Sequence, residues 1–391
     1  MEHRDREHRG KLEKFLIPET IFGVGSLAEV GDAVRRAGGS RALVVTDPGV
    51  LAAGWAGRAL PHLADAGVSW QIWSGVTPNP KDTEVEAGFG QYRESGCDVL
   101  VAIGGGSPID AAKAIAVLSG NGGHILDYEG IDTVGKPIPP MVMVPSTGGS
   151  GADVSQFCVI TDTGRRLKAT IAGRALVPDI SVTDPSLLTT MPPELSAHTA
   201  LDALSHGIEA YVSKAASFLS DGHALAAIRG VLDHLLPTID DPDDLLAREG
   251  IARASLQAGI AFTNALLGAT HAIAHQIGGY LDLPHGLLNA ILLPHVMRFN
   301  AVTHADRFVG VAGAMGVETA RLSPFEAAEA AIATVQRLRE KVGVPAGLAK
   351  VGVRREHLAR FAENALNDAY ITTNPRAVSK EDVEQICLAA L

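Results

Sequence analysis

The histidines between residues 271 and 285 have the spacing of a metal site. His271 and His275 are four residues apart, which on a helix places both imidazoles on one face. His285 follows Pro284, where a new helix is expected to begin. Because imidazole is a common metal ligand in proteins, this segment predicts a bound metal ion.

A second motif offers a carboxylate and an imidazole with the same offset. Asp202 and His206 are expected to lie on one helix, one turn apart, so both side chains can reach one point. Asp202 lies within the apolar sequence Ala-Leu-Asp-Ala-Leu, and a buried carboxylate needs a partner such as a cation. With residues 271–285, the chain supplies one carboxylate and four imidazoles. The spacing leaves open which three of the four histidines coordinate.

A glycine-rich turn offers a place for a diphosphate. Residues 104–113 read Gly-Gly-Gly-Ser-Pro-Ile-Asp-Ala-Ala-Lys and follow a strand expected at 98–103. Gly104, Gly105 and Gly106 let backbone N–H groups approach an anion, and the positive end of the following helix faces it. Ser107 and Pro108 open that helix, where proline is favoured. The alternative interpretation is a tight turn without a ligand.

An acid at the end of an earlier strand favours NAD over NADP. Asp47 closes the strand expected at 42–47 and precedes Pro48. A carboxylate at this position can accept hydrogen bonds from the adenosine ribose and would repel a 2′-phosphate. A helix cap or a turn former is the alternative interpretation of Asp47.

Small and hydroxylic residues also follow the next strand. The strand expected at 141–144 runs into residues 145–153, which read Pro-Ser-Thr-Gly-Gly-Ser-Gly-Ala-Asp and include Ser146 and Thr147. Two such loops on neighbouring strands form a crevice, which is the usual ligand site of an open α/β sheet.

A metal beside a dinucleotide indicates alcohol chemistry. Nitrogen and oxygen ligands without a thiolate suit Fe(II) or zinc, and the donor set does not separate the two. Such a metal is a Lewis acid that lowers the pKa of an alcohol and promotes hydride transfer to nicotinamide.

Strands and helices alternate along the first half of the chain. Helices are expected at 26–36 and 82–95, and short apolar runs predict the strands named above, with a weaker one at 180–182. This alternation predicts an α/β domain in which helices cover both faces of a mostly parallel sheet.

The second half of the chain is predicted to be all helical. From about Pro192 the strand-like runs disappear, and long Ala- and Leu-rich stretches occupy 194–214, 219–236, 244–264, 325–342 and 356–366. We therefore expect a dinucleotide-binding domain at 1–188, with a flexible tail at 1–12, and a helical metal-binding domain at 189–391.

Composition excludes several other classes of protein. A net charge of −11, without a basic run, argues against nucleic acid binding. The charged N-terminus is unlike an export signal, and no apolar run has the length of a membrane span. Three widely spaced cysteines do not form a disulfide framework, so a reducing cytoplasm is expected.

Taken together, these motifs resemble those of the iron-containing, or group III, alcohol dehydrogenases over nearly the whole chain. The resemblance is carried by residues 104–113, by residues 202–211 (Asp-Ala-Leu-Ser-His-Gly-Ile-Glu-Ala-Tyr) and by residues 271–294. It implies a dinucleotide-binding α/β domain, an all-helical domain and an active site in the cleft between them. It also implies a homodimer or larger homo-oligomer that acts on a small primary alcohol or aldehyde.

The resemblance also implies a role for individual residues. The metal ligands would be Asp202, His206, His271 and His285. His275 would be the histidine that does not coordinate the metal, and it would lie near the substrate, where it could transfer a proton. The contacts with NAD would come from Asp47, residues 104–108, Ser146, Thr147 and Lys168.

The chain departs from the family pattern at two places. The second loop reads Ser-Thr-Gly-Gly-Ser-Gly-Ala-Asp where relatives commonly have Thr-Thr-Ala-Gly-Thr-Gly-Ser-Glu, which keeps most hydroxyl groups. Tyr370 stands where relatives often carry cysteine, near the substrate cleft of the family, and is expected to alter substrate choice.

Three other functions are alternatives to alcohol oxidation. A metal-dependent lyase of the dehydroquinate synthase type would need a Lys and Arg cluster for a phosphorylated sugar acid, which these motifs lack. A metal-dependent hydrolase would not need paired loops for a dinucleotide. A non-catalytic binding or scaffold protein is the least favoured alternative, and a dry, metal-free site would indicate it.

Overall fold

Six parallel strands form the sheet of the first half of the computed structural model, which describes residues 14–391. In order across the sheet they are β1 (Glu19–Phe22), β9 (Ile180–Thr183), β6 (Met141–Pro145), β4 (Val99–Gly104), β2 (Arg41–Val45) and β3 (Ser69–Trp73). The prediction of a mostly parallel sheet is confirmed. The tail predicted at 1–12 lies outside the described residues.

Helices cover both faces of this sheet because its strands are apolar on both sides. On β4, Val101 and Ile103 pack in one core with the helices α2 and α4, whereas Leu100 and Ala102 pack in a second core with α5 and α6. The helices of this half are α2 (Val30–Arg36), α3 (Pro48–Ala52), α4 (Trp55–Asp65), α5 (Asp82–Glu94) and α6 (Gly106–Asn121).

The strand order reverses between β2 and β4. The chain runs from β2 outward to β3 and then returns to place β4 on the other side of β2. In parallel α/β sheets, ligands bind at the carboxyl ends of the strands beside such a reversal. Asp47 follows β2 there, and residues 104–106 join the end of β4 to the start of α6, so the topology places these two sequence features at the same crevice.

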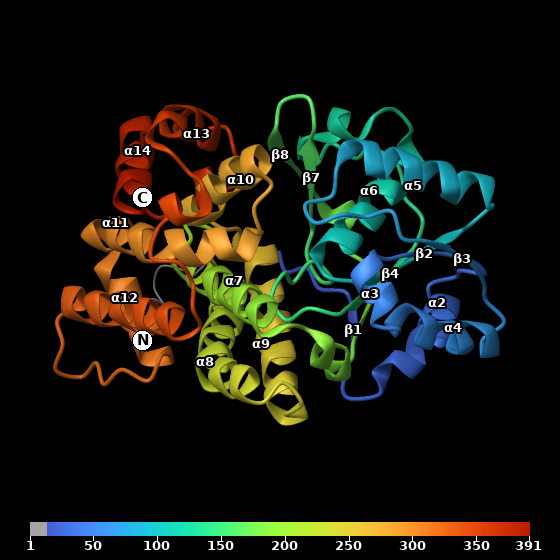
Figure 1. Ribbon diagram of the computed structural model, residues 1–391, viewed down its shortest axis with the longest axis horizontal. Helices are drawn as coiled ribbons and strands as arrows, with labels where there is room; N and C mark the ends of the chain where they lie inside the picture. The colour runs from blue at the N-terminus through green and yellow to red at the C-terminus, as the bar shows by residue number, and fades with distance from the viewer. Residues whose placement is uncertain (1–13) are drawn as a thin grey trace.

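A small second sheet was not predicted from the sequence. It consists of β5 (Gly130–Ile131), β8 (Leu167–Ala172) and β7 (Phe157–Asp162), and β7 and β8 form an antiparallel hairpin. The hairpin reaches toward the helix α10 of the other half (Figure 1). Arg166, at its turn, donates a hydrogen bond of 2.8 Å to the carbonyl of Tyr280 on α10.

The second half consists of helices, as predicted (Figure 1). They are α7 (Pro193–Val212), α8 (Phe218–Asp240), α9 (Leu245–Ala265), α10 (Ala269–Leu281), α11 (His285–Ala314), α12 (Pro324–Lys341), α13 (Leu358–Ala365) and α14 (Lys380–Ala389). Short 3₁₀ turns are η1 (Ser26–Glu29), η2 (Ile125–Tyr128), η3 (Arg174–Leu176), η4 (Pro185–Thr190), η5 (Leu348–Val351), η6 (Arg355–His357) and η7 (Ala369–Thr373). The division at 188 and 189 stays a prediction. Every helix within residues 14–391 is too short or too polar to cross a membrane.

Candidate metal and cofactor site

Four of the predicted side chains converge on one point. Asp202, His206, His271 and His285, here called the metal cluster, each offer a donor atom, and these atoms all lie within 4.8 Å of one another. Asp202 and His206 come from α7, His271 comes from α10, and His285 is the first residue of α11. Helices far apart in the sequence therefore build the cluster.

A glycine lets α11 approach α7 closely enough to join the cluster. A Cβ atom at Gly286 would lie 2.3 Å from the carbonyl oxygen of His198 on α7. Only glycine fits at such a separation, so close helix packing explains why glycine follows His285 in the sequence.

The amide of Asn289 lies against three of the four cluster residues. Its Nδ2 atom donates to Asp202 Oδ1 at 2.7 Å and lies 2.9 Å from His271 Nε2 and 3.0 Å from His285 Nε2. A single nitrogen can contact all three only because their acceptor atoms point inward. The donor set and its convergence fit one divalent metal ion.

Glu209 fixes the orientation of His271. Its carboxylate accepts from His271 Nδ1 at 2.6 Å and from the backbone N–H groups of Gly268 and Thr270. Both side chains are buried. With its Nδ1 proton held, His271 presents Nε2 to the cluster, which is the usual arrangement of a metal-ligating histidine.

His206 is held by the loop that follows β6. Its Nδ1 lies 3.2 Å from the carbonyl oxygen of Gly149, and its ring stacks on Phe262 with a centroid separation of 4.5 Å. Gly149 itself packs against α7, where a Cβ would lie 2.2 Å from Thr199 O. By contrast, His285 Nδ1 is buried without a hydrogen-bond partner among the described residues.

The charges of the metal cluster call for a cation. Burial alone would raise the pKa of Asp202, but the imidazoles around it outweigh that effect and hold the pKa below its usual range. Burial lowers the pKa of His206 to about 4 and that of His285 well below its usual value, so both are neutral ligands at pH 7. Burial also acts to lower the pKa of His271, yet its bonds to Asp202 and Glu209 raise it to about 9. Two buried carboxylates thus face a single imidazolium, which leaves one negative charge among these groups; a metal ion would replace the proton and offset that charge.

His275 is not part of the metal cluster. Its Nδ1 lies 2.8 Å from Asp368 Oδ2, and Asp368 also caps the turn η7 by accepting from Tyr370 N at 3.0 Å. The ring centroid of His275 lies 5.3 Å from that of His285 and 5.6 Å from that of Tyr370. His275 therefore stands beside the cluster, with Nδ1 committed to a carboxylate and Nε2 free of that bond.

The two predicted loops lie against each other at the edge of the sheet. Ser146 N donates to Gly104 O at 2.9 Å, and β4 and β6 are paired up to these residues. A Cβ on Gly105 would lie 3.0 Å from Thr147, so a side chain there would fill the space between the loops. The N-cap Gly105 offers no side chain to the first N–H groups of α6. These groups and the absence of Cβ atoms fit a diphosphate.

Asp47 serves as the N-cap of α3. Its Oδ1 accepts from Val50 N at 2.9 Å, so the helix-cap interpretation is confirmed. The cap and a ribose contact are compatible, because a carboxylate has two oxygens.

Lys168, on β8, places a buried cation between the glycine loop and the metal cluster. Its ammonium interacts with Asp110 on α6 and with Asp202. A Cβ on Gly278 of α10 would lie 3.6 Å from its Nζ. Burial lowers the pKa of Lys168 to about 8, and Asp110 opposes that shift. Lys113 is a different case, because its ammonium is bound to the carbonyl oxygens of Ser155 and Phe157 and holds β7 onto α6.

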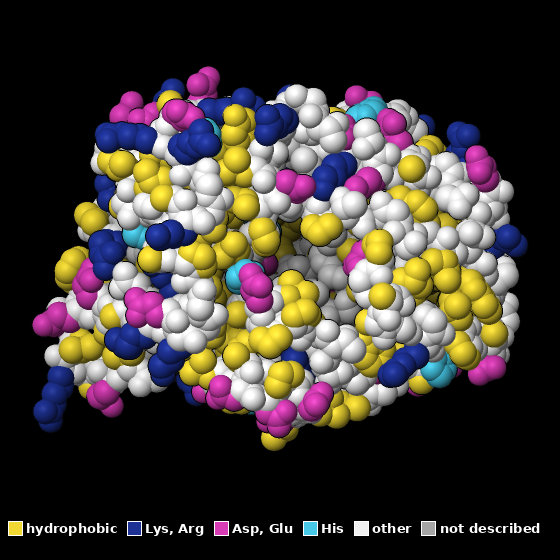
Figure 2. Space-filling model, viewed as in Figure 1, with side chains coloured by type: hydrophobic (Ala, Val, Ile, Leu, Met, Phe, Trp, Pro, Cys, Tyr) yellow, Lys and Arg dark blue, Asp and Glu magenta, His cyan; other side chains and the backbone are white. Residues whose placement is uncertain are grey.

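The face seen in Figure 2 is hollowed between the two halves.

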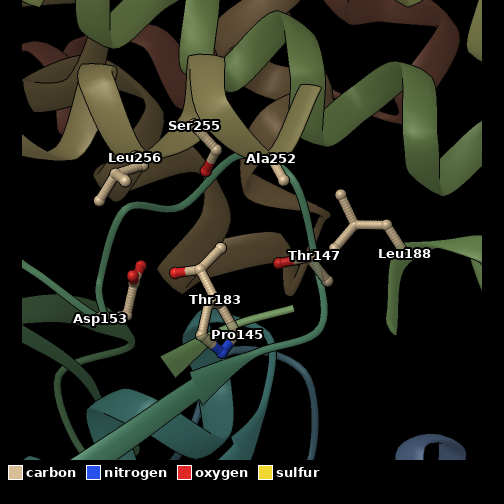
Figure 3. Close-up of a pocket in the computed structure, with 8 residues that line it drawn as sticks. All are labelled: Pro145, Thr147, Asp153, Thr183, Leu188, Ala252, Ser255 and Leu256. Atoms are coloured by element: carbon tan, nitrogen blue, oxygen red, sulfur yellow. The ribbon is translucent and has the colours of Figure 1, made fainter. Parts of the chain in front are cut away.

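Beyond the second loop, a small cavity of about 10 Å³ separates β6 and β9 from α9 (Figure 3). Thr147, Asp153, Thr183 and Ser255 are among the residues that line it. Burial raises the pKa of Asp153, whose Oδ2 accepts from Ser181 Oγ at 2.7 Å. The space holds about one water molecule, which is too little for a substrate.

Two family models match the chain. The model of iron-containing alcohol dehydrogenase matches residues 18–185, and that of the C-terminal part of the Fe-containing alcohol dehydrogenase family matches residues 196–391. The chain belongs to the iron-containing alcohol dehydrogenases. The resemblance noted from the motifs is thereby confirmed, as is the prediction of an NAD(H)-dependent alcohol or aldehyde oxidoreductase.

Relatives cover almost the whole chain. A 1,3-propanediol dehydrogenase of Citrobacter freundii is 40% identical over 379 residues, which is 96% of this chain and 98% of the relative. An NAD-dependent methanol dehydrogenase of Bacillus methanolicus is 37% identical over 377 residues, which is 96% of this chain and 99% of the relative. The crystal structure of a 1,3-propanediol oxidoreductase superposes with a TM-score of 0.94 at 40% identity, covering 97% of this chain and 100% of that one. Neither the lyase nor the hydrolase alternative is favoured by these relatives.

Sequence reasoning missed the residues that support the site. Glu209 lies within the motif at 202–211, three residues after His206, and this helical spacing was a signal that could have been used. Asn289 lies one helical turn after His285 and offered the same signal. Asp368 had no local signal, because it reaches His275 across 93 residues of sequence.

Proposed function

We propose that the chain transfers a hydride between NAD(H) and a small primary alcohol or its aldehyde at one divalent metal ion held by Asp202, His206, His271 and His285. The observation that carries the proposal is the convergence of these four donor atoms, with His206 in contact with the loop that follows β6. The relatives named for 1,3-propanediol and for methanol support a small alcohol.

Iron is the proposed metal, and zinc is the second candidate. The family is named for iron, while one carboxylate and three imidazoles are equally suited to zinc. When bound, either ion supplies a Lewis acid that lowers the pKa of an alcohol hydroxyl. The residues of the chain hold that ion and keep the imidazoles of His206 and His285 neutral through burial.

His275 is proposed to move the proton of the reaction. Burial lowers its pKa below the usual value, and Asp368 opposes that shift, so the imidazole is neutral at pH 7 and can accept a proton. Because Asp368 holds Nδ1–H at 2.8 Å, Nε2 is the atom that exchanges the proton. Asp368 also favours the imidazolium that forms when the proton is accepted.

The cofactor is proposed to bind along the two loops. Its diphosphate would lie on Gly104, Gly105, Gly106, Ser107 and Pro108 at the N-terminus of α6, with Ser146 and Thr147 on the facing loop. The ribose would bind the Asp47 oxygen that does not cap α3. Lys168 would contact the cofactor near its nicotinamide end, since the ammonium interacts with both Asp110 and Asp202. When bound, the nicotinamide supplies the hydride acceptor.

A homodimer or larger homo-oligomer, as the family resemblance implies, is also proposed and is tested by light scattering during size-exclusion chromatography. A reducing cytoplasmic location is proposed because Cys97, Cys158 and Cys387 are buried and unpaired.

Nicotinamide absorbance with metal-loaded protein tests the proposed reaction. The purified chain, loaded with Fe(II) or Zn(II), is assayed with a panel of alcohols with NAD and of aldehydes with NADH. Turnover of short primary substrates is expected. Absence of turnover across the panel, in protein shown to contain metal, would refute the proposed reaction.

Two histidine variants separate metal binding from proton transfer. His271→Ala is expected to lose the metal and all activity, because a ligand is removed. His275→Ala is expected to keep the metal and lose about 10²–10⁴-fold in rate, the range for a proton-transfer group. Equal metal content and equal rates in the two variants would contradict the division of roles.

A further inference from the structure

The turn between α10 and α11 sets where α11 begins and therefore where His285 lies. Asp282 ends α10 in a left-handed conformation, with φ 53° and ψ 40°, and Pro284 caps α11 just before His285. Three residues therefore separate the helix that carries His271 from the one that carries His285. Any shift of this turn moves His285 relative to the other cluster residues.

A residue of the sheet-bearing half holds this turn. Asn79, in the loop after β3, donates from Nδ2 to Asp282 Oδ1 at 2.8 Å and to Leu283 O at 3.3 Å. Lys81 adds an ion pair from Nζ to Asp282 Oδ2 at 3.4 Å. The Asp282 side chain is 61% exposed, so the ion pair is weak and the buried amide of Asn79 is the stronger contact.

Asn79 is itself fixed in place. It is 8% exposed, and its backbone is left-handed with φ 55°. Its carbonyl accepts from Thr161 Oγ1 at 3.3 Å, and Thr161 N donates to Pro80 O at 2.8 Å, which ties the loop to β7. The turn at 282–284 is thus held by a loop of the other half that is itself bonded to β7.

Fewer side-chain contacts orient His285 than orient the other residues of the metal cluster, so its position depends more on the backbone. Glu209 orients His271, the carbonyl of Gly149 contacts His206, and Asn289 donates to Asp202. Among the described residues, His285 Nδ1 has no hydrogen-bond partner. Apart from the contact of its Nε2 with Asn289, the imidazole of His285 is placed by its backbone, which is positioned by the turn at 282–284 together with the close packing of Gly286 on α7.

We propose that Asp282 is a positioning residue: its bond with Asn79 holds His285 at the metal cluster, so retention of the metal depends on contact between the two halves. The proposal rests on the metal site of the proposed function and deepens it. Residues of the sheet-bearing half thereby influence the binding of the metal without contacting it, as supporting residues around metal sites do.

Two substitutions at Asp282 distinguish the side-chain contact from the backbone shape. Asp282→Gly removes the carboxylate and still adopts the left-handed conformation, whereas Asp282→Asn keeps both an oxygen acceptor and a tolerance for that conformation. We expect Asp282→Gly to bind Zn(II) about 10-fold more weakly or worse. Asp282→Asn should restore wild-type affinity, because Asn79 can still donate to its oxygen.

The affinity of the full-length protein for Zn(II) is measured by competition with a chelator. Co(II) loading provides a second readout, because its visible absorption changes when an imidazole ligand is lost. The melting temperature of each metal-free variant shows whether it is folded. If Asp282→Gly melts at a lower temperature than the wild type, Asn79→Gly removes the same bond from the other side, together with the bond to Leu283 O. Asn79 is left-handed too, so glycine can adopt its conformation.

A double-mutant cycle decides whether the bond is responsible. Asp282→Gly and Asn79→Gly should each weaken metal binding. The loss in the double variant should be smaller than the sum of the two single losses, because both substitutions remove the Asn79–Asp282 bond. Wild-type affinity in both single variants, additive losses, or equal losses in Asp282→Gly and Asp282→Asn would each overturn the proposal. If the wild-type protein binds no metal at all, the proposed function fails instead.

Discussion

Replacing Glu209 by glutamine tests how the chain prepares a metal ligand. The Glu209 carboxylate accepts from His271 Nδ1 at 2.6 Å, from Thr270 N at 2.7 Å and from Gly268 N at 3.1 Å, and it is 3% exposed. Glutamine has nearly the same shape but only one acceptor oxygen. Its NH₂ group must therefore face at least one of these donors. The substitution removes a charge and leaves a buried donor without an acceptor.

Glu209→Gln is expected to weaken metal binding. Loss of a residue that orients a metal-ligating histidine weakens metal binding by about 10–100-fold, which is about 1.4–2.7 kcal/mol. Since Glu209 both fixes the ring of His271 and raises its basicity, Glu209→Gln belongs in that range. Activity at saturating metal should recover in large part, because no ligand has been removed.

Zn(II) competition with a chelator, at one pH, measures the effect of Glu209→Gln. Glu249→Gln is a matched control on α9, where the acid pairs with Arg253 near the surface, and it should leave metal affinity unchanged. The melting temperature of the metal-free proteins shows whether each variant folds. Wild-type affinity in folded Glu209→Gln would refute the reasoning.

Three further predictions concern the cofactor and the substrate. NADH affinity should fall as the pH rises through about 8. Burial lowers the pKa of Lys168 to about 8, so the side chain is charged below that pH and neutral above it. In Lys168→Met, fluorescence titration should show NADH affinity about 10-fold weaker at pH 7 and little dependence on pH. Asp47→Gly should raise kcat/KM for NADP relative to NAD, and an unchanged ratio would contradict the ribose contact. Tyr370→Cys should raise kcat/KM for longer alcohols relative to short ones, because the buried ring stands 5.6 Å from that of His275; an unchanged chain-length profile would show that Tyr370 does not limit substrate size.

Local sequence patterns indicated much of the metal cluster. Helical periodicity placed Asp202 with His206 on α7, and Pro284 marked the start of α11 at His285. The same periodicity could not decide between His271 and His275, because residues one turn apart share a face. The way α10 packs against α7 and α11 makes that choice, and this packing is a property of the tertiary structure.

The supporting contacts lay beyond local patterns. Asp368 reaches His275 across 93 residues, and Asn79 reaches Asp282 across 203. Nor did the sequence indicate the β7–β8 hairpin, whose short strands are interrupted by polar residues such as Thr161 and Lys168. The glycine loop was predictable because its signal, strand then glycines then helix, is contained in one short segment.

Anomalous X-ray diffraction from crystals of the protein loaded with Fe(II) would test the central claim most directly. One metal peak is predicted within bonding distance of Asp202 and of a ring nitrogen of each of His206, His271 and His285. His275 should remain outside the coordination shell, still bound to Asp368 as it is at 2.8 Å. A peak coordinated by His275 in place of one of those histidines, or no peak at the metal cluster, would contradict the account.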